Sequence, residues 1–421
     1  MMLVDIDIDG KRYKTENNRN LLDLLLSEGF DVPHLCYEKD LSPVGSCGLC
    51  LVEIKGKGIV KACEEKTKHG MEVITWNKRI EKARKDAFIF LLQFTRHPTS
   101  CLFCNKYDEC KGIDKCLKGL DLKKGCKACP KNRDCVIQKL AKKFHLSGLD
   151  IEVKERGLEE IKEPFFVRDY NYCILCSKCI RICHEKRLQG SCIAYLKIGT
   201  HIPSFLEEGC KSCGSCLDIC PTGTFYNPKE EEPDYWVKGL CPYCGTGCAL
   251  ELGVKDERIV KIRGDKQGIN NGELCVKGRF GIVEFVNSKE RLESPLLKKN
   301  GSFIPISWED AIGIICKNLK GHMGKIGVIG SAKCTNEENF LIQKFARLVL
   351  KTNNIDHCAR LCHSSTATAL SMSLGYSAMT NSIEEIQESK TIIIIGANPT
   401  ENHPIIGLKI KEAKEKGARL I

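Results

Sequence analysis

Two runs of closely spaced cysteines dominate the middle of this 421-residue chain. Both have the spacing C-x2-C-x2-C-x3-C, and they comprise Cys173, Cys176, Cys179 and Cys183, then Cys210, Cys213, Cys216 and Cys220. Thiolates this close on one loop can surround a cubane of iron and sulfide, and the fourth cysteine of each such run ligates the other run's cluster. Two complete runs are too specific a pattern for coincidence. We therefore predict two 4Fe–4S clusters, with electron transfer as their chemistry.

The composition fits a globular chain in a reducing compartment. The chain has 28 cysteines, but thiols in C-x2-C sets are poorly placed to bridge one another, so metal ligation explains them better than disulfides. Residues 1–10 lack the basic start of a signal peptide, and no apolar run is long enough to span a bilayer. We expect a cytoplasmic protein with no membrane span.

The formal net charge of +11 does not indicate nucleic-acid binding. Cluster ligands are thiolates, and each iron–sulfur cluster is itself anionic. A four-thiolate oxidised cluster carries about −2, so five clusters, one with a histidine ligand, would total roughly −9. The basic excess is then mostly counter-charge for metal sites, and we expect no nucleic-acid partner.

Residues 1–78 predict a small α+β unit that carries a third cysteine set. Alternating apolar residues over 4–8, the turn signal Asp9-Gly10 and a leucine-rich helix over 21–26 precede the set. Its members, spaced C-x10-C-x2-C-x12-C, are Cys36, Cys47, Cys50 and Cys63. This arrangement resembles the ferredoxin-like 2Fe–2S β-grasp domain at the start of complex I large iron–sulfur subunits, iron hydrogenases and NAD-linked formate dehydrogenases. A zinc loop is the alternative, but the hairpin, the helix and the long first gap favour iron.

Residues 79–150 predict a helical, lysine-rich segment with a histidine among its candidate ligands. The spacing H-x3-C-x2-C-x5-C is formed by His97, Cys101, Cys104 and Cys110. It resembles the 4Fe–4S site of the same families that uses one histidine and three cysteines. Replacing one thiolate by histidine removes a negative charge and should raise the reduction potential of the cluster.

A second triple in this segment leaves the ligand assignment open. It repeats the C-x2-C-x5-C spacing and comprises Cys126, Cys129 and Cys135. In one partition His97 joins the first triple. In the other, His97 joins the second triple and the first triple combines with Cys116 to hold a further cluster or zinc. The shorter loops of the first partition close at a lower entropic cost.

Residues 233–290 contain a set spaced C-x2-C-x3-C with a distant fourth member, namely Cys241, Cys244, Cys248 and Cys275. With Lys277 close behind, the set resembles the N-terminal 4Fe–4S loop of molybdenum or tungsten bis-pterin oxidoreductases. In that family the lysine matching Lys277 lies between the cluster and the pterin. Zinc is the alternative for the spacing alone, but the position after a ferredoxin pair and before the helix start at Ser307 favours iron.

From residue 291 the cysteine density falls and α/β patterning begins. Apolar runs over 326–329 and 391–395 predict strands, a helix is expected over 409–416, and 418–421 begins another strand. Parallel sheets bind ligands in loops at the carboxyl ends of their strands. By resemblance to the bis-pterin family, the loop with Gly396 and Asn398 helps to hold a pterin nucleotide.

The stretch 331–365 resembles the formate dehydrogenase catalytic subunit. In that family a selenocysteine or cysteine ligates the metal and is followed directly by histidine, and the matching positions here are Cys362 and His363. The resemblance implies that Cys362 ligates molybdenum or tungsten and that His363 orients formate or accepts its proton. A soft thiolate suits a sulfur-bound heavy metal, and an imidazole titrates near neutral pH.

The resemblance covers essentially the whole chain and implies a multidomain α+β architecture. The expected domains are a 2Fe–2S ferredoxin-type domain (1–78), a helical segment with a histidine-ligated 4Fe–4S cluster (79–150), a two-cluster ferredoxin domain (164–232), a 4Fe–4S domain (233–290) and a partial molybdopterin oxidoreductase domain (291–421). The implied cofactors are one 2Fe–2S cluster, four 4Fe–4S clusters, or five if the extra cysteines hold one, and a Mo or W bis-molybdopterin guanine dinucleotide.

These features together predict the N-terminal part of a formate dehydrogenase alpha subunit. Electrons from formate would pass through the cluster near Lys277, then the ferredoxin pair, then the histidine-ligated and 2Fe–2S sites. No G-x-G-x-x-G follows a predicted strand, so NAD, if it is the acceptor, would bind a flavin-carrying partner; ferredoxin is the other candidate acceptor. The family's catalytic subunit continues for several hundred residues, so we expect this chain to be a fragment or to have a separate companion chain.

Two other functions fit parts of the pattern. One is a different bis-pterin oxidoreductase with the same clusters. The other is an electron-transfer subunit resembling the complex I large iron–sulfur subunit, without active metal chemistry. The pair Cys362 and His363 distinguishes these possibilities, since a pure relay has no reason to keep a soft ligand beside a base.

Overall fold

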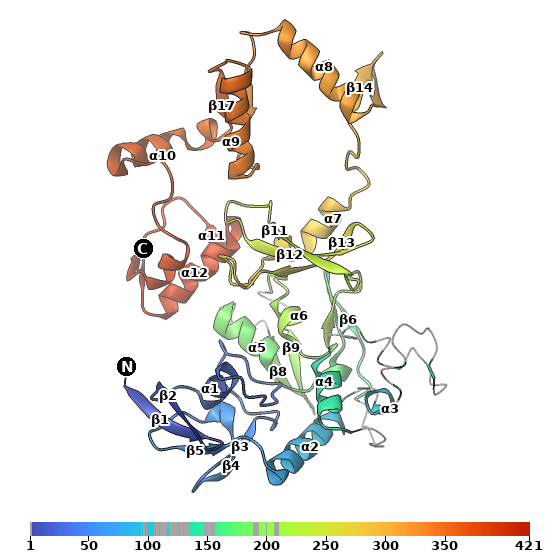
Figure 1. The fold of residues 1–421 in the computed structure, drawn as a ribbon, viewed down its shortest axis with the longest axis vertical. Coiled ribbons are helices and arrows are strands. Elements are labelled where there is room, and N and C mark those ends of the chain that lie inside the picture. The colour runs from blue at the N-terminus through green and yellow to red at the C-terminus, as the bar shows by residue number, and fades with distance from the viewer. Residues whose placement is uncertain are drawn as a thin grey trace. The chain divides into compact units, whose positions relative to one another are not determined.

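The computed structural model divides the chain into two compact units, Met1–Glu230 and Glu231–Ile421, which are described separately (Figure 1). The structure describes residues 2–93, 95, 97, 99–104, 106, 109, 116–117, 126, 129, 131, 135–146, 151, 156–187, 193–198, 200–205 and 210–421. Cys110, one of the predicted ligands, lies outside the described residues. Within the described residues, no helix is long and apolar enough to cross a bilayer.

The N-terminal part of the first unit is a five-stranded sheet covered by one helix. The sheet order is β2-β1-β5-β3-β4. The element bounds are β1 (Leu3–Ile8), β2 (Lys11–Glu16), α1 (Leu21–Ser27), β3 (Leu51–Ile54), β4 (Gly58–Lys61) and β5 (Glu72–Ile74). The Asp9-Gly10 turn is confirmed, because both residues adopt positive φ, 50° and 82°, as a tight hairpin requires. Inward-facing Val4, Ile6 and Ile8 share one core with the buried leucines of α1.

The predicted helix near residue 21 is also confirmed, and its start has a local cause. The side chain of Asn20 accepts a hydrogen bond from the backbone N–H of Asp23 at 3.2 Å, which satisfies an otherwise unpaired amide at the first turn. The helix ends by Gly29, whose φ is 82°. Cys50 and Cys63 belong to the same buried cluster as the leucines of this helix, whereas Cys36 and Cys47 belong to the cluster around Phe88.

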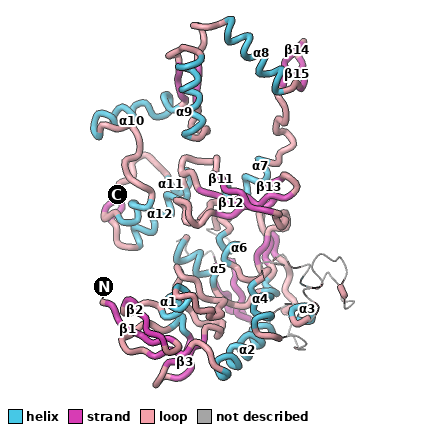
Figure 2. Tube along the Cα trace, viewed as in Figure 1, coloured by secondary structure: helices cyan, strands magenta, loops and turns pink. Residues whose placement is uncertain are grey.

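Helices connect this sheet to the cysteine-rich middle of the chain (Figure 2). They are α2 (Lys78–Gln93), α3 (Thr99–Leu102) and α4 (Val136–Lys143). The rings of Phe88 on α2 and Phe144 at the end of α4 lie 5.5 Å apart by centroid. Phe88, Leu92, Ile137 and Leu140 belong to one buried cluster, which also includes thiols from three of the predicted sites.

The two cysteine runs of the first unit lie on loops that start short helices. The first run leads into α5 (Lys178–Arg181) and the π-helix η5 (Ile182–Lys186), and the second leads into α6 (Ser215–Ile219). A three-stranded sheet, β10-β7-β6, joins the ends of this region, with bounds β6 (Ile161–Lys162), β7 (Val167–Arg168) and β10 (Phe225–Tyr226). An antiparallel hairpin, β8 (Ile193–Ile198) and β9 (Thr200–Phe205), lies between the runs in sequence.

The two loops have the same backbone shape. Leu175 and Ser212, each two residues after the first cysteine of its run, have φ of 54° and 49°. Ser177 and Gly214, each four residues after it, have φ of 56° and 74°. Left-handed backbone is uncommon for residues with a side chain, so its recurrence at matching positions shows that one loop conformation is built twice.

The second unit begins with a three-stranded antiparallel sheet, β11 (Tyr235–Leu240), β12 (Ala249–Lys255) and β13 (Arg258–Gly264). The π-helix η6 (Lys277–Gly281) and α7 (Ile282–Val286) follow. Leu250, Ile262, Leu274 and Ile282 form a buried cluster with Cys248. Ile405, far along the chain, joins the same cluster.

The rest of the second unit consists of short parallel strand pairs with intervening helices. Strand β16 (Val328–Gly330) pairs with β17 (Ile355–His357), and β18 (Thr391–Ile392) pairs with β19 (Arg419–Leu420). The other elements are β14 (Leu296–Lys299), β15 (Ser302–Pro305), α8 (Trp308–Gly321), α9 (Asn336–Lys344), η7 (Phe345–Val349), α10 (Ala359–Leu374), η8 (Glu384–Glu388), α11 (Pro399–Asn402) and α12 (Pro404–Glu415). The predicted helix start at Ser307 is confirmed, since its hydroxyl accepts the N–H of Asp310 at 3.0 Å.

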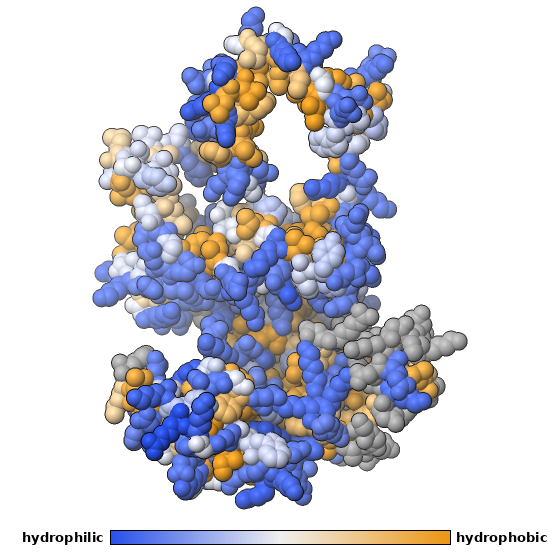
Figure 3. Space-filling view, viewed as in Figure 1, coloured by the Kyte–Doolittle hydropathy of each residue, from blue (hydrophilic) through white to orange (hydrophobic). Residues whose placement is uncertain are grey.

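Large apolar side chains are exposed on this last part. They include Trp308 (70%), Ile312 (56%), Phe340 (63%) and Leu361 (88%). Figure 3 shows apolar surface gathered over α8 and α9. The apolar faces of these helices are therefore unpartnered within the described chain.

Candidate metal centres

The four cysteines of the N-terminal set lie together and are buried. Cys36, Cys47, Cys50 and Cys63 are each at most 4% exposed. Cys36 interacts through its side chain with Cys47 and Cys63, and Cys63 with Cys50. Received hydrogen bonds lower the pKa of the Cys36 and Cys50 thiols, while donated hydrogen bonds raise the pKa of Cys47 and Cys63. Bound metal replaces such shared protons.

A glycine turn shapes this loop. Gly45 has a φ of 64°, and a Cβ added there would lie 2.0 Å from Oε1 of Glu64. A residue with a side chain would therefore be strained and would collide with Glu64. Glycine therefore suits this turn between Cys36 and Cys47, since any other residue would be strained by the positive φ and would require the Glu64 side chain to move.

His97 is buried with one ring nitrogen unpaired. The side chain is 4% exposed, its ring interacts with the backbone of Tyr172, and its Nε2 has no hydrogen-bond partner among the described residues. Burial lowers the pKa of His97 to about 4, so the ring is neutral at physiological pH. Neutral imidazoles that ligate metals commonly donate their other N–H to a backbone carbonyl. A buried, unpaired Nε2 lone pair is therefore suited to metal ligation.

The structure groups the remaining cysteines of this segment across the two triples. Cys101 interacts with Cys126 through its side chain, and Cys135 lies close enough to affect Cys126 electrostatically. Cys129 in turn is influenced by Cys135, and burial raises its pKa to about 11. Neither predicted partition unites Cys101 with Cys126. Cys104 and Cys116 are half-buried.

The ferredoxin-like loops bring cysteines of different runs together. Cys220, the last member of the second run, lies near Cys173, Cys176 and Cys179 of the first. Crossed ligation requires this grouping. Burial raises the pKa of Cys173 to about 11 and that of Cys176 to about 12, which keeps the free thiols protonated until metal displaces the proton.

The cysteines of the second unit also converge. Burial raises the pKa of Cys248 to about 12, and the nearby thiols of Cys241, Cys244 and Cys275 act in the same direction. The backbone N–H of Cys241 donates to the carbonyl of Cys248 at 2.9 Å, which closes the loop. Lys277 follows on η6 and is exposed. Nζ of Lys333 donates to the carbonyl of Tyr243 at 3.2 Å, so the α/β part contacts this loop.

Cys362 and His363 lie on the first turns of α10, just after β17. Both are exposed. The loop after the neighbouring parallel strand β16 is fixed by Asn339, whose Nδ2 donates to the carbonyl of Ser331 at 2.9 Å. The backbone N–H of Ala332 in that loop donates to Sγ of Cys358 at 3.1 Å. Both loops thus meet at the carboxyl ends of parallel strands, where α/β sheets bind ligands.

Gly396 and Asn398 follow the other parallel pair. Gly396 has a φ of 60° and Asn398 caps α11; both are exposed. The strand before them is shorter than predicted, because pairing with β19 extends only over Thr391–Ile392. The loop is therefore placed at the end of a parallel strand, as the pattern predicted.

Sequence reasoning missed two groups of residues near the thiols. Hydroxyls two residues after a cysteine approach its sulfur: Oγ1 of Thr222 is 3.5 Å from Cys220 Sγ, and Oγ1 of Thr246 is 3.5 Å from Cys244 Sγ. Arginines near the cysteine loops form the second group, of which Arg84 is buried and Arg156 is half-buried. Arg84 lies near Cys50, and Arg156 donates to the carbonyl of Cys173 at 2.8 Å. The hydroxyls could have been found from the recurring C-x-T pattern, whereas the arginines carry no local signal.

The thiols approach one another in pairs and loose groups. Among the described residues, no three His, Cys, Asp or Glu side chains converge tightly enough to hold a single ion. A tetrahedral zinc site needs sulfurs about 2.3 Å from one ion. An iron–sulfur cluster spreads its thiolates over several iron atoms, and thiols that meet in pairs and loose groups are compatible with that arrangement.

Four protein families match successive parts of the chain. They are the 2Fe-2S iron-sulfur cluster binding domain (2–78), the 4Fe-4S dicluster domain (162–225), the molybdopterin oxidoreductase Fe4S4 domain (234–288) and the molybdopterin oxidoreductase family (291–421). The predicted fold class, with these domains in this order, is confirmed. The domains also confirm 2Fe–2S, 4Fe–4S and molybdopterin as the classes of cofactor.

Similar proteins of known sequence are longer. Two, each named "Putative formate dehydrogenase", come from Staphylococcus aureus strains MRSA252 and MW2; each is 29% identical over 97% of this chain and 44% of its own length. The chain thus spans less than half the length of these relatives. The crystal structure of an NAD+-reducing NiFe hydrogenase in the H2-reduced state is 21% identical, with a TM-score of 0.40 over 53% of this chain and 87% of that one.

The cysteine sets, the strand-end loop with Cys362 and the ordered family matches agree with one another. The family matches cover each predicted cysteine set except the one between residues 79 and 150. Residues 291–421 match the molybdopterin oxidoreductase family, and segments that match 2Fe–2S and 4Fe–4S domains precede them in the chain.

Proposed function

We propose that the protein oxidises formate to carbon dioxide at a molybdenum or tungsten bis-pterin centre and passes the electrons through iron–sulfur clusters. The pair Cys362 and His363, on the first turns of a helix that follows a parallel strand, carries this proposal. The names of the S. aureus relatives support formate as the substrate. This chain spans less than half the length of those relatives, so the activity is proposed for the whole protein.

The residues near Cys362 have separate tasks in this proposal. Cys362 would ligate the metal, and His363 would accept the proton as formate loses a proton and two electrons. The metal–pterin group, when bound, would supply the acceptor for those two electrons. Lys277 would supply a positive charge near the cluster of Cys241, Cys244, Cys248 and Cys275. Gly396 and Asn398, in the loop after β18, would help to hold a pterin nucleotide.

The iron–sulfur ligands follow from the thiol groups described above. Pairs Cys36/Cys47 and Cys50/Cys63 would each bind one iron of the 2Fe–2S cluster. His97 would ligate a 4Fe–4S cluster through Nε2. Crossed ligation would give the first ferredoxin cluster to Cys173, Cys176, Cys179 and Cys220, and the second to Cys183, Cys210, Cys213 and Cys216.

The electrons would pass from the clusters to a partner protein. A flavoprotein that reduces NAD, or a ferredoxin, would receive them, since no dinucleotide-binding G-x-G-x-x-G follows a strand here. The cytoplasm is the proposed compartment, because free thiols and cluster ligands persist under reducing conditions.

Anaerobic purification with metal analysis tests the proposal. The chain should be brown and contain roughly 18 iron atoms or more if one 2Fe–2S and four 4Fe–4S clusters fill. The full polypeptide should then bleach when formate is added without any other reductant. Zinc with little iron would refute the relay, and iron that formate cannot reduce would refute the substrate.

A further inference from the structure

Arg181 is a buried arginine that connects two predicted cluster sites. It ends α5, two residues after Cys179, and is 6% exposed. One of its terminal nitrogens donates to the carbonyl of Cys36, in the N-terminal set, and to the carbonyl of Cys176, in the first ferredoxin run, at 3.3 Å. Cys36 and Arg181 are 145 residues apart in sequence. A single guanidinium therefore spans two loops that carry ligands of different sites.

The other contacts of Arg181 fix its orientation. Its second terminal nitrogen donates to the carbonyl of Ser42, in the loop between Cys36 and Cys47, and its Nε donates to Oγ of Ser177 at 3.3 Å. A planar guanidinium presents its donors in a rigid fork, so acceptors on two sides hold it in one position. The guanidinium is therefore fixed between the loops.

Within the described parts of the chain, no carboxylate pairs with the charge of Arg181. All its hydrogen-bond acceptors are neutral carbonyl or hydroxyl oxygens, and among the described residues no acidic side chain forms an ion pair with it. A buried cation without a counter-charge is costly. Anionic clusters held by the Cys36 and Cys176 loops would supply that counter-charge from both sides.

Neighbouring charges differ from Arg181 in this respect. Lys178, on the same helix, is buried but pairs with Glu38 at 2.9 Å. Glu185 on η5 accepts the backbone N–H of Ser42 at 2.7 Å. These contacts join the same two loops. The charge of Lys178 is paired with Glu38, and Glu185 keeps its negative charge, whereas the charge of Arg181 is placed between the Cys36 and Cys176 loops.

We propose that Arg181 is a positioning residue that holds the 2Fe–2S loop against the first ferredoxin loop and raises the reduction potentials of both clusters with one shared charge. Reduction adds negative charge to a cluster, so a fixed cation nearby favours the reduced form. The inference rests on the proposed iron–sulfur function, because it requires both clusters to be present.

Potentiometric EPR on the anaerobically purified full chain tests the inference. Arg181→Gln removes the charge and keeps an amide donor, so the midpoint potentials of the 2Fe–2S cluster and of one 4Fe–4S cluster should fall together. The potential of the cluster held by Cys241 and Cys275 should not move. Arg79→Gln is the matched control, since Arg79 lies in the same compact unit, Met1–Glu230, and its side chain is 77% exposed; it should change no potential.

A second variant distinguishes the loss of the charge from the loss of a cluster. If Arg181→Gln loses iron, Arg181→Lys is measured in its place, because it keeps the charge without the fork. Iron retained at near wild-type potentials in that variant supports the role of the charge; iron lost from both variants overturns it and leaves only a role in folding. Unchanged potentials in a fully loaded Arg181→Gln, or a fall at one cluster alone, also overturn the inference. Wild-type chain without iron would instead refute the proposed function.

Discussion

The loops with the cysteine sets and the loop with Cys362 differ in how much of each is buried by the rest of the chain. Cys36, Cys50 and Cys63 are at most 1% exposed and lie in packed cores. Cys362 and His363 are exposed, on a helix with no buried residue. Cysteines separated by two residues close a loop at small entropic cost, whereas a pterin pocket needs contributions from distant parts of a chain. The thiol sets are therefore enclosed by the described chain, whereas the loop with Cys362 is exposed.

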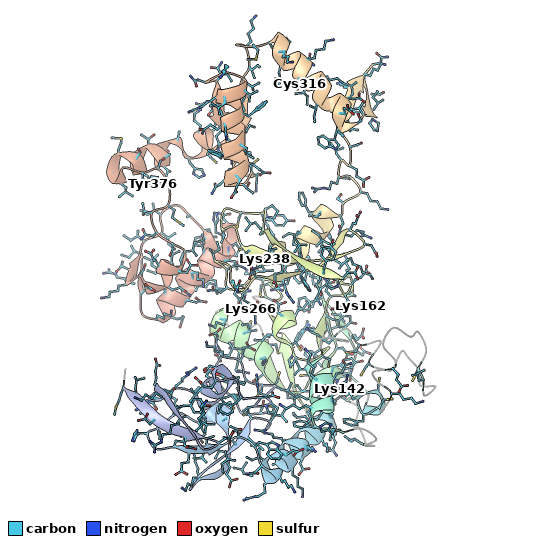
Figure 4. The ribbon with its side chains drawn as sticks, viewed as in Figure 1. Lys142, Lys162, Lys238, Lys266, Cys316 and Tyr376 are labelled. Carbon is cyan, nitrogen blue, oxygen red and sulfur yellow. The ribbon has the colours of Figure 1, made fainter. Side chains whose placement is uncertain are left out.

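The largest effect should follow from Cys362→Ala in the full-length protein. Loss of a metal ligand should abolish formate oxidation, well beyond the roughly 10–100-fold cost of losing a hydrogen-bond partner of a ligand. The EPR signals of the iron–sulfur clusters should persist, because their ligands lie elsewhere. Cys316→Ala, an exposed cysteine on α8 (Figure 4), serves as the control and should keep full activity. Turnover retained in Cys362→Ala would contradict the catalytic role.

Anaerobic removal of iron should destabilise the regions of buried thiols and leave the α/β part unchanged. Each buried polar group left without its partner costs about 1–3 kcal/mol, so several cysteines together exceed the margin of a typical small domain. Hydrogen exchange should show lost protection over 36–63 and 173–187, but not over 308–321. Equal loss in both regions, or none in either, would remove the distinction between them.

Replacing the predicted histidine ligand should change one cluster only. His97→Cys adds a thiolate, so the potential of that cluster should fall while the iron content stays the same. His97→Ala should lose the cluster. His322→Cys, at an exposed position of the second unit, is the control for an added cysteine. Potentiometric EPR checks the result, and unchanged potentials in His97→Cys would show that His97 binds no iron.

The smallest effect should come from the hydroxyl near Cys244. With a cluster bound, Thr246 would donate to the thiolate, so Thr246→Val should lower that cluster's potential by less than about 60 mV, a tenfold change for one electron. Thr380→Val, at an exposed position, is the control. A higher potential in Thr246→Val would mean that the hydroxyl does not donate to the sulfur.

Local signals in the sequence predicted much of the fold. Asp9-Gly10 makes the expected hairpin, and Ser307 starts the expected helix, because turn and cap preferences act over a few residues. Strand limits were less accurate. Pairing was expected over 326–329 but lies at Val328–Gly330, because its limits depend on where the partner strand begins, at Ile355.

Which residues meet at each site could not be predicted from the sequence, because it depends on long-range contacts. The meeting of Cys101 with Cys126 and the position of Arg181 depend on how separate segments pack. The backbone partner of His97 likewise comes from a residue far along the chain, Tyr172. Spacing identifies which residues can bind metal, but packing decides which of them share a site.

The twice-built loop has a consequence for how two clusters could differ. Its left-handed turns are the same in both copies, yet Cys173 and Ile174 are buried in one, whereas Cys210 and Lys211 face solvent in the other. Water stabilises added negative charge better than an apolar interior does. Identical scaffolds would thus present their irons with unequal dielectric surroundings, and side chains that make no bond to metal would decide which copy holds an electron more readily.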